Sequence, residues 1–207
     1  IEDLADNASF EEVAYLLLLG KLPTLSELNE FEEELSSQRK MPDSLVNVIE
    51  SIPSSAHPME VVRTIISYMG VIEPEKTFED QLKVAKRLIG VTTTAIVYWY
   101  NFSHHGVRVN QDSNESSVAG HFLKLLRQKD IPELDKKTLD VSLTLYAEHE
   151  FNASTFTGRV CASTLSDLHS CLTAAVGSLR GPLHGGANEE AMKMLQQISS
   201  VDEVKSF

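Results

Sequence analysis

The 207-residue chain has few basic residues, only two cysteines and no long apolar run. Eighteen Lys and Arg stand against thirty Asp and Glu, and the formal net charge of −12 argues against nucleic acid or an anionic membrane as a partner. Apolar runs such as residues 16–19 are far shorter than a membrane-spanning helix. Cys161 and Cys171 cannot build a disulfide framework, which predicts a reducing, cytoplasmic compartment.

Both ends of the sequence are abrupt. It opens on Ile1-Glu2-Asp3, and it stops at Phe207 without a capping or helix-breaking residue. We therefore expect these residues to be a piece of a longer protein.

Helix-start signals, followed by apolar residues three or four positions apart, run through most of the sequence. Ser9–Glu12 and Thr24–Glu27 have the pattern of capping boxes, while Pro42 and Pro58 mark the start of two further helices. The predicted helices cover residues 9–20, 24–35, 43–49, 58–70, 77–100, 118–127, 132–148, 166–179 and 188–198.

Two of these segments also carry strand features. Residues 91–100 are rich in β-forming side chains, and the apolar residues between 139 and 145 alternate. Helix is nevertheless favoured, because no hairpin dipeptide flanked by alternating runs occurs anywhere. Gly70 is interpreted as a helix stop and residues 101–115 as a loop. The sequence thus predicts an all-α bundle of roughly nine or ten helices, in a single domain spanning residues 1–207.

A histidine between two carboxylates is the first candidate functional feature. His149 lies between Glu148 and Glu150 at the end of an apolar helix, and a run of small polar residues follows. A purely structural reading is also open, because the helix dipole favours histidine near a helix C-terminus.

The second candidate, His184, stands between Gly181-Pro182 and Gly185-Gly186, just before another helix. Glycine allows a close approach of the backbone, and the free N–H groups and positive dipole end of a helix N-terminus would hold an imidazole neutral. A neutral imidazole can donate its N–H to a carbonyl; the alternative is an ordinary loop histidine.

A zinc site is not expected. Cys161, His169 and Cys171 could supply ligands, but their spacing matches no common zinc pattern, and unpaired cysteines usually behave as small hydrophobic residues.

The two histidine segments resemble the citrate synthase family. Glu148–Thr155 is similar to that family's D/E-H-E-x-N-A-S-T motif, and Gly181–Asn188 to its G-P-x-H-G-G-A-N motif. The segment His57-Pro58-Met59 also looks like the family. The resemblance implies the multi-helix large domain of the citrate synthase fold, with residues 1–207 forming most of that domain and the small domain absent from the sequence.

The resemblance also implies roles for individual residues. His149 would bind oxaloacetate, and His184 would donate a hydrogen bond to the thioester carbonyl of an acyl-CoA as the enol forms. Acyl-CoA is then a substrate, and no separate cofactor is expected. Four further motif residues would support the site: Asn152, Gly185, Gly186 and Asn188.

Tyr146 favours one branch of the family. Typical citrate synthases have a histidine three residues before the motif histidine, whereas the form Tyr-Ala-Glu-His-Glu-Phe-Asn-Ala-Ser-Thr found here is similar to bacterial 2-methylcitrate synthases. These condense propionyl-CoA with oxaloacetate, retain some acetyl-CoA activity and serve propionate catabolism. Two alternatives stay open: a citrate synthase proper, and a non-catalytic helical interaction module.

The family's catalytic Asp, its second His and its carboxylate-binding arginines have no counterpart after Asn188, so the chain by itself is expected to be inactive. Family members are homodimers, and we expect the helices from Ser166 onward to contribute to that interface. The reason is that the helix after Ser166 carries apolar residues on almost every side: Leu168, Leu172, Ala175, Val176 and Leu179.

Overall fold

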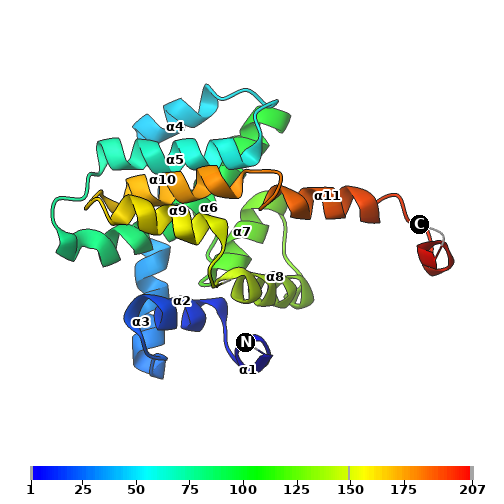
Figure 1. Cartoon of the computed structure of the whole chain (residues 1–207), viewed down its shortest axis with the longest axis horizontal. Coiled ribbons are helices and arrows are strands. Elements are labelled where there is room, and N and C mark those ends of the chain that lie inside the picture. The colour runs from blue at the N-terminus through cyan, green and yellow to red at the C-terminus, as the bar shows by residue number, and fades with distance from the viewer. Residues whose placement is uncertain (1, 149, 206–207) are drawn as a thin grey trace.

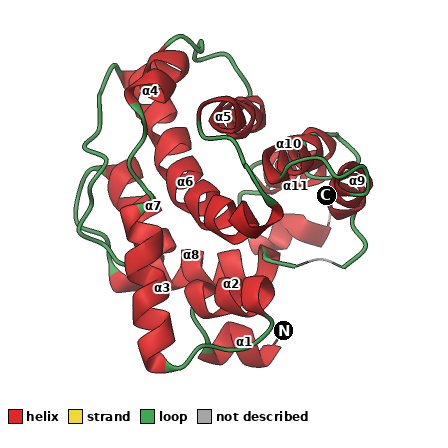
Figure 2. Ribbon diagram, turned by 90° about the vertical axis from the view of Figure 1, so that its left-hand side faces the viewer, coloured by secondary structure: helices red, strands yellow, loops and turns green. Residues whose placement is uncertain are grey.

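The computed structural model describes residues 2–148 and 150–205, without the side chains of Asp202 and Lys205. Over these residues the chain is helical and contains no strand, which confirms the all-α class (Figures 1 and 2). The helices are α1 (Glu2–Asn7), α2 (Phe10–Leu19), α3 (Leu25–Ser37), α4 (Asp43–Glu50), α5 (Pro58–Ile72), η1 (Phe78–Asp80), α6 (Gln81–His105), α7 (Val118–Arg127), α8 (Glu133–Tyr146), α9 (Ala153–Ala162), α10 (Leu168–Leu179), α11 (Gly186–Leu195) and η2 (Val201–Lys205).

Side-chain caps begin several of these helices where the sequence predicts them. The Ser9 and Thr24 side chains each accept from the backbone N–H three residues on, and Glu12 and Glu27 return the bond, so both capping boxes are complete. Gly20 then ends α2 in the left-handed conformation, with φ of 78°. These local signals specify where α2 and α3 begin and where α2 ends.

Helix α6 runs through the middle of the molecule and organises the core (Figure 2). Helices α4, α5 and α10 pack on one side of it, and α3 and α7 on another. Val91 and Trp99 of α6 are 0% and 1% exposed, respectively. Helix α9 packs along α10, and α11 extends away from the body (Figure 1). No described helix is both long and apolar enough to cross a lipid bilayer.

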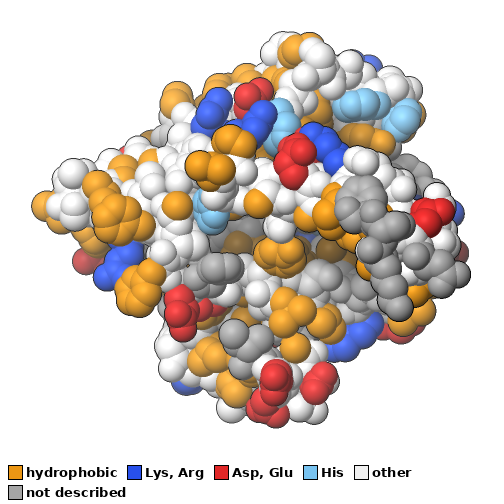
Figure 3. Space-filling model, turned by 45° about the vertical axis from the view of Figure 1, so that its right-hand side comes forward, with side chains coloured by type: hydrophobic (Ala, Val, Ile, Leu, Met, Phe, Trp, Pro, Cys, Tyr) orange, Lys and Arg blue, Asp and Glu red, His pale blue; other side chains and the backbone are white. Residues whose placement is uncertain are grey.

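Some apolar side chains remain at the surface. Phe151 and Leu183 are 90% and 99% exposed, and hydrophobic side chains lie around a hollow on one face of the molecule (Figure 3). Leu168, Leu172 and Val176, by contrast, pack against the chain's own core beside α5 and α6. The apolar character of α10 therefore has an explanation within one chain and no longer argues for a dimer by itself.

The sequence expectations were wrong at four places. Helix α5 continues through Gly70 to Ile72. The glycine allows close packing and is not a stop, since a Cβ at residue 70 would lie 2.8 Å from the Cβ of His169 on α10. Helix α6 extends to His105 instead of ending near residue 100, and Gly106 is its left-handed cap, with φ of 69°. Helices α1 and α9 were not predicted. Residues 139–145 lie in α8, so the helix predicted there is confirmed in spite of their alternating pattern.

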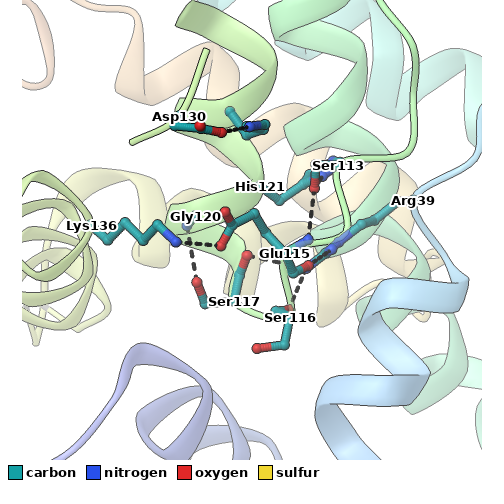
Figure 4. Close-up of polar contacts among 10 residues, drawn as sticks. Arg39, Ser113, Glu115, Ser116, Ser117, Gly120, His121, Asp130 and Lys136 are labelled. Carbon is teal, nitrogen blue, oxygen red and sulfur yellow. Dashed lines mark hydrogen bonds and ion pairs between the residues drawn. The ribbon is translucent and has the colours of Figure 1, made fainter. Parts of the chain in front are cut away.

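The loop between α6 and α7 is held by one buried arginine. The guanidinium of Arg39 donates to the carbonyl oxygens of Glu115, Ser116 and Ser117, the last at 3.2 Å (Figure 4). Ser117 then caps α7 by accepting from the backbone N–H of Gly120 at 3.0 Å. This clasp ties the end of α3 to the start of α7.

His121 joins the same loop to α6. Its Nδ1 lies 2.7 Å from Ser113 Oγ, and its Nε2 lies 2.8 Å from Thr94 Oγ1. Burial, with a further contribution from the charge of Arg39, lowers the pKa of His121 to about 4. The imidazole is therefore neutral in the folded protein near pH 7, and one ring nitrogen donates while the other accepts.

Because the pKa of His121 is lowered in the folded protein, we expect stability to fall at acid pH. Between about pH 6.5 and pH 4 the unfolded chain binds a proton at residue 121 that the folded chain does not, so the free energy of unfolding falls as the pH falls. We expect the free energy of unfolding to fall by about 3 kcal/mol across this window because of His121. Urea unfolding from pH 7 to pH 4 measures it. His121→Asn should flatten the profile, while His105→Asn at the surface should leave it unchanged; parallel profiles for all three proteins would contradict the prediction.

Candidate active site

The two histidine segments meet at the open end of the α9–α10 hairpin. The first segment leads from the end of α8 into the N-terminus of α9, and the second connects the end of α10 to α11. The first turn of α9 and the turn that follows α10 consequently lie side by side.

Asn152 organises the start of α9. Its side-chain oxygen Oδ1 accepts from the backbone N–H of Thr155 at 2.8 Å, which makes it the N-cap, and also accepts from Ser154 Oγ at 2.6 Å. One side chain thus begins the helix and orients the hydroxyl of Ser154. The expectation that Asn152 supports the site agrees with this position.

His184 contacts Ser154 through one ring nitrogen. The Nε2 atom accepts from the backbone N–H of Ser154 at 3.3 Å and lies 2.9 Å from Ser154 Oγ. A backbone N–H can only donate, so Nε2 is the acceptor in that contact, and Nδ1 is the ring nitrogen that can carry the N–H. The single hydroxyl proton of Ser154 is directed either to Asn152 Oδ1 or to Nε2. Within the described chain Nδ1 has no hydrogen-bond partner. The half-buried imidazole therefore presents a fixed N–H donor.

The turn that carries His184 depends on a close backbone approach. The N–H of His184 donates to Gly181 O at 3.0 Å, and the N–H of Gly185 donates to Leu179 O at 2.9 Å. A side chain at residue 185 would overlap that same carbonyl oxygen, so only glycine is accommodated. Gly186 is less restricted, because a Cβ there would lie 3.1 Å from Gly181 O.

A cavity of about 530 Å³ opens next to this turn. The N-terminus of α5, the end of α8 and the start of α11 enclose it, and its lining includes Tyr146, Arg180 and Asn188. The side-chain amide of Asn188 donates to the hydroxyl of Tyr146 at 3.4 Å, so α11 touches α8 there. The volume is sufficient for a small organic acid together with the acyl end of a thioester.

A hydrogen bond between His57 and Glu189 closes one side of the cavity. His57 caps α5 by accepting from the backbone N–H of Met59 at Nδ1, 3.1 Å away, and its Nε2 lies 3.1 Å from Glu189 Oε2 on α11. Hydrogen bonds from His57 and then Lys193 lower the pKa of Glu189. The sequence analysis placed His57 only in a segment that looks like the family, and it did not predict the contact with α11.

Most of the predicted site residues lie together. His184, Asn152, Gly185, Gly186 and Asn188 all belong to the arrangement just described. His149 lies outside the described residues, so its predicted contact with oxaloacetate stays a prediction. Among the residues with described positions, no three His, Cys, Asp or Glu side chains converge as metal ligands.

Ser154 contacts His184, and the sequence reasoning did not single it out. It lies inside the same motif as Asn152, two residues further on, and a signal was therefore available. The motif alone does not show that its partner is thirty residues away at His184.

Comparison with known proteins identifies the family. The family model described as "Citrate synthase, C-terminal domain" matches residues 1–207. A 2-methylcitrate synthase of Shewanella oneidensis is 54% identical over 198 residues, covering 96% of this chain and 53% of that protein. A citrate synthase of Deinococcus radiodurans is 39% identical over 210 residues, covering 100% of this chain and 55% of that protein. The chain spans about half the length of the curated relatives it matches.

Solved structures show the same fold. The citrate synthase of Thermoplasma acidophilum, in a ternary complex with carboxymethyl coenzyme A and oxaloacetate, superposes with a TM-score of 0.88 at 30% identity. The match covers 99% of this chain and 54% of that one.

Proposed function

Because the chain belongs to the citrate synthase family, we propose that its parent protein is a 2-methylcitrate synthase, an acyltransferase that condenses propionyl-CoA with oxaloacetate. The products are 2-methylcitrate and CoA, and some activity with acetyl-CoA accompanies the main reaction. The observation that carries the proposal is the contact of the His184 imidazole with Ser154 through Nε2, which leaves Nδ1 directed away from that contact as a donor.

His184 performs the electrostatic part of the chemistry. When the α-carbon of the acyl group loses a proton, negative charge develops on the thioester oxygen. The Nδ1–H of His184 donates to that oxygen, and because Ser154 already fixes the ring, no reorganisation is needed as the charge appears. The enol carbon then attacks the ketone carbon of oxaloacetate, and hydrolysis of the thioester releases CoA. A fixed donor of this kind contributes about 3 to 4 kcal/mol.

Binding of the keto acid, oxaloacetate, is assigned to the segment that contains His149. His149 is proposed to bind oxaloacetate. Tyr146, three residues earlier in the sequence, and Asn188 line the cavity described above. The proton acceptor that the family uses, an Asp, has no matching motif in these 207 residues, so the chain by itself is proposed to be inactive.

The substrate assignment is tested by steady-state kinetics of the full-length protein with propionyl-CoA and acetyl-CoA. A larger kcat/KM with propionyl-CoA supports the proposal. A clear preference for acetyl-CoA would favour a citrate synthase, the alternative suggested by the 39% identical relative. The absence of condensation with either thioester would favour a non-catalytic helical module.

Tyr146 provides a smaller, specific prediction. Its side chain is 71% exposed and lines the cavity opposite Arg180 and the glycine turn. Tyr146→His should move the ratio of kcat/KM toward acetyl-CoA by no more than about tenfold, because one methylene in a pocket is worth about 1 to 3 kcal/mol and several residues share it. The measurement is kcat/KM with propionyl-CoA and with acetyl-CoA for the wild type and the variant. A complete reversal of the preference would contradict the prediction.

We further propose that the full-length protein is a homodimer located in the cytoplasm. Phe151, Phe156 and Val160 are 90%, 69% and 51% exposed around α9, and apolar groups of this size are usually covered in an assembly. We expect sedimentation equilibrium of the full-length protein to give twice the chain mass. A well-behaved monomer that binds no hydrophobic dye would contradict this prediction.

A further inference from the structure

The two cysteines of the chain lie on adjacent helices, near the connection between α9 and α10 and away from His184. Cys161 is in the last turn of α9, and Cys171 is in the first turn of α10. Gly158, one turn before Cys161, shows how close the helices are, because a Cβ built there would lie 3.6 Å from both Cys171 O and Ala175 Cβ. Only five residues connect the two helices, and the Cys161 thiol, one turn further along α9, interacts with the Cys171 thiol.

The two thiols have different environments. Cys171 is buried, and its Sγ–H donates to the carbonyl oxygen of Ser166 at 3.7 Å. Burial first, and then the neighbouring Cys161 thiol, raises the pKa of Cys171 to about 11. Cys161 is half-buried and so is accessible to a small solute. A cavity of about 420 Å³ beside Cys171, lined also by Gly158 and Ala162, leaves room for side-chain movement.

We propose that hydrogen peroxide converts Cys161 and Cys171 into an intramolecular disulfide that locks α9 to α10. Cys161 reacts first: its sulfur takes one oxygen from peroxide, forming a sulfenic acid and releasing water. The Cys171 sulfur then attacks the Cys161 sulfur, an S–S bond forms, and the hydroxyl leaves as a second water with the Cys171 proton. In total, two thiols and one peroxide give one disulfide and two waters.

The bond would act on the helices that build the site. The N-terminus of α9 carries Ser154, and the C-terminus of α10 leads into the turn of His184. The cysteines lie at the closed end of this hairpin, so oxidation fixes the two helices to each other without touching the contact between Ser154 and His184. It also replaces the weak bond from Cys171 to Ser166.

The test is oxidation of the folded full-length protein with hydrogen peroxide, followed by peptide mapping under non-reducing conditions. We expect the peptides that contain residues 161 and 171 to be joined, with the loss of two hydrogen atoms, and to separate again after dithiothreitol. In Cys171→Ser, residue 161 should instead stop at a sulfenic acid that dimedone traps. In Cys161→Ser, Cys171 should keep its free thiol.

A matched control moves the reactive thiol by one residue. The double variant Cys161→Ser with Val160→Cys places the thiol about 100° away around α9, on the face proposed for the dimer, where it should not join to Cys171. The proposal is overturned if the native wild-type protein gives oxygenated Cys161 without the cross-link, if residue 161 joins a second chain instead, or if the bond forms only after denaturation. These readouts on the wild-type protein do not depend on how well any variant folds.

Discussion

Replacing His184 by alanine should lower kcat for the condensation of propionyl-CoA with oxaloacetate by about 10² to 10³ fold. The bond from Nδ1–H to the thioester oxygen strengthens as negative charge develops, so its loss falls on the transition state more than on the bound ground state. Oxaloacetate binding, measured directly by calorimetry, should change little. The comparison needs the full-length protein and both thioesters.

Two related variants separate this role from a structural one. Ser154→Ala removes a hydroxyl 2.9 Å from Nε2 but leaves the backbone N–H that fixes the tautomer, so its effect on kcat should be clearly smaller. His149→Ala should instead raise the oxaloacetate concentration required, because that residue is assigned to the keto acid. Near-normal turnover in His184→Ala would mean that the glycine turn is only a structural element.

Gly185→Ala should be the second most damaging change in the site. The new Cβ would overlap the carbonyl oxygen and side chain of Leu179, so the turn has to shift and the bond from the N–H of residue 185 to Leu179 is lost. A displacement of about 1 Å at His184 costs about a hundredfold in kcat/KM. Overpacking of this kind also lowers the free energy of unfolding by about 1 to 3 kcal/mol.

Gly177→Ala is the matched control for this experiment. Gly177 lies in α10, and a Cβ there would meet nothing within 4 Å. Alanine is the better helix former by about 1 kcal/mol, so this variant should be as stable as the wild type or more stable, with normal kinetics. Kinetics and urea unfolding of both variants provide the test, and equal behaviour of the two alanines would show that the approach at residue 185 is not needed.

The sequence predicted the fold well where the signals are local. Helices α2 and α3 each begin at a complete capping box, and such a box needs only four consecutive residues. Helix α9 was missed because Ala153–Ala162 is a mixture of small, β-branched and aromatic residues with no buried position. It is helical because Asn152 caps it and because Gly158 lets it pack closely on α10.

The site was predictable as a set of residues but not as a geometry. The motifs placed His184 and Asn152 in one site through their resemblance to a family, and the structure places both there. The tautomer of His184 depends on an N–H thirty residues away, and the need for glycine at 185 depends on the carbonyl oxygen of Leu179. Both arise from the packing of α9 on α10 and from the path of the turn, which no single segment encodes. Gly70 is a further example. The sequence predicts a helix end there, but the glycine lies within α5 and permits close contact with His169, which is distant in the sequence.

The position of His184 also has a consequence for amide hydrogen exchange. Helix α10 packs into the core through Leu172 and Val176, so its amides open only when much of the molecule unfolds. Helix α11 has no buried residue and meets the body through polar contacts such as His57 with Glu189, so its amides open locally. Protection therefore drops between residues 179 and 186, and the imidazole lies at this boundary. A ligand that bridges His184 and α11 would also have to order that helix, which reduces its net binding free energy. Slower exchange of the α11 amides would then indicate that the ligand is bound.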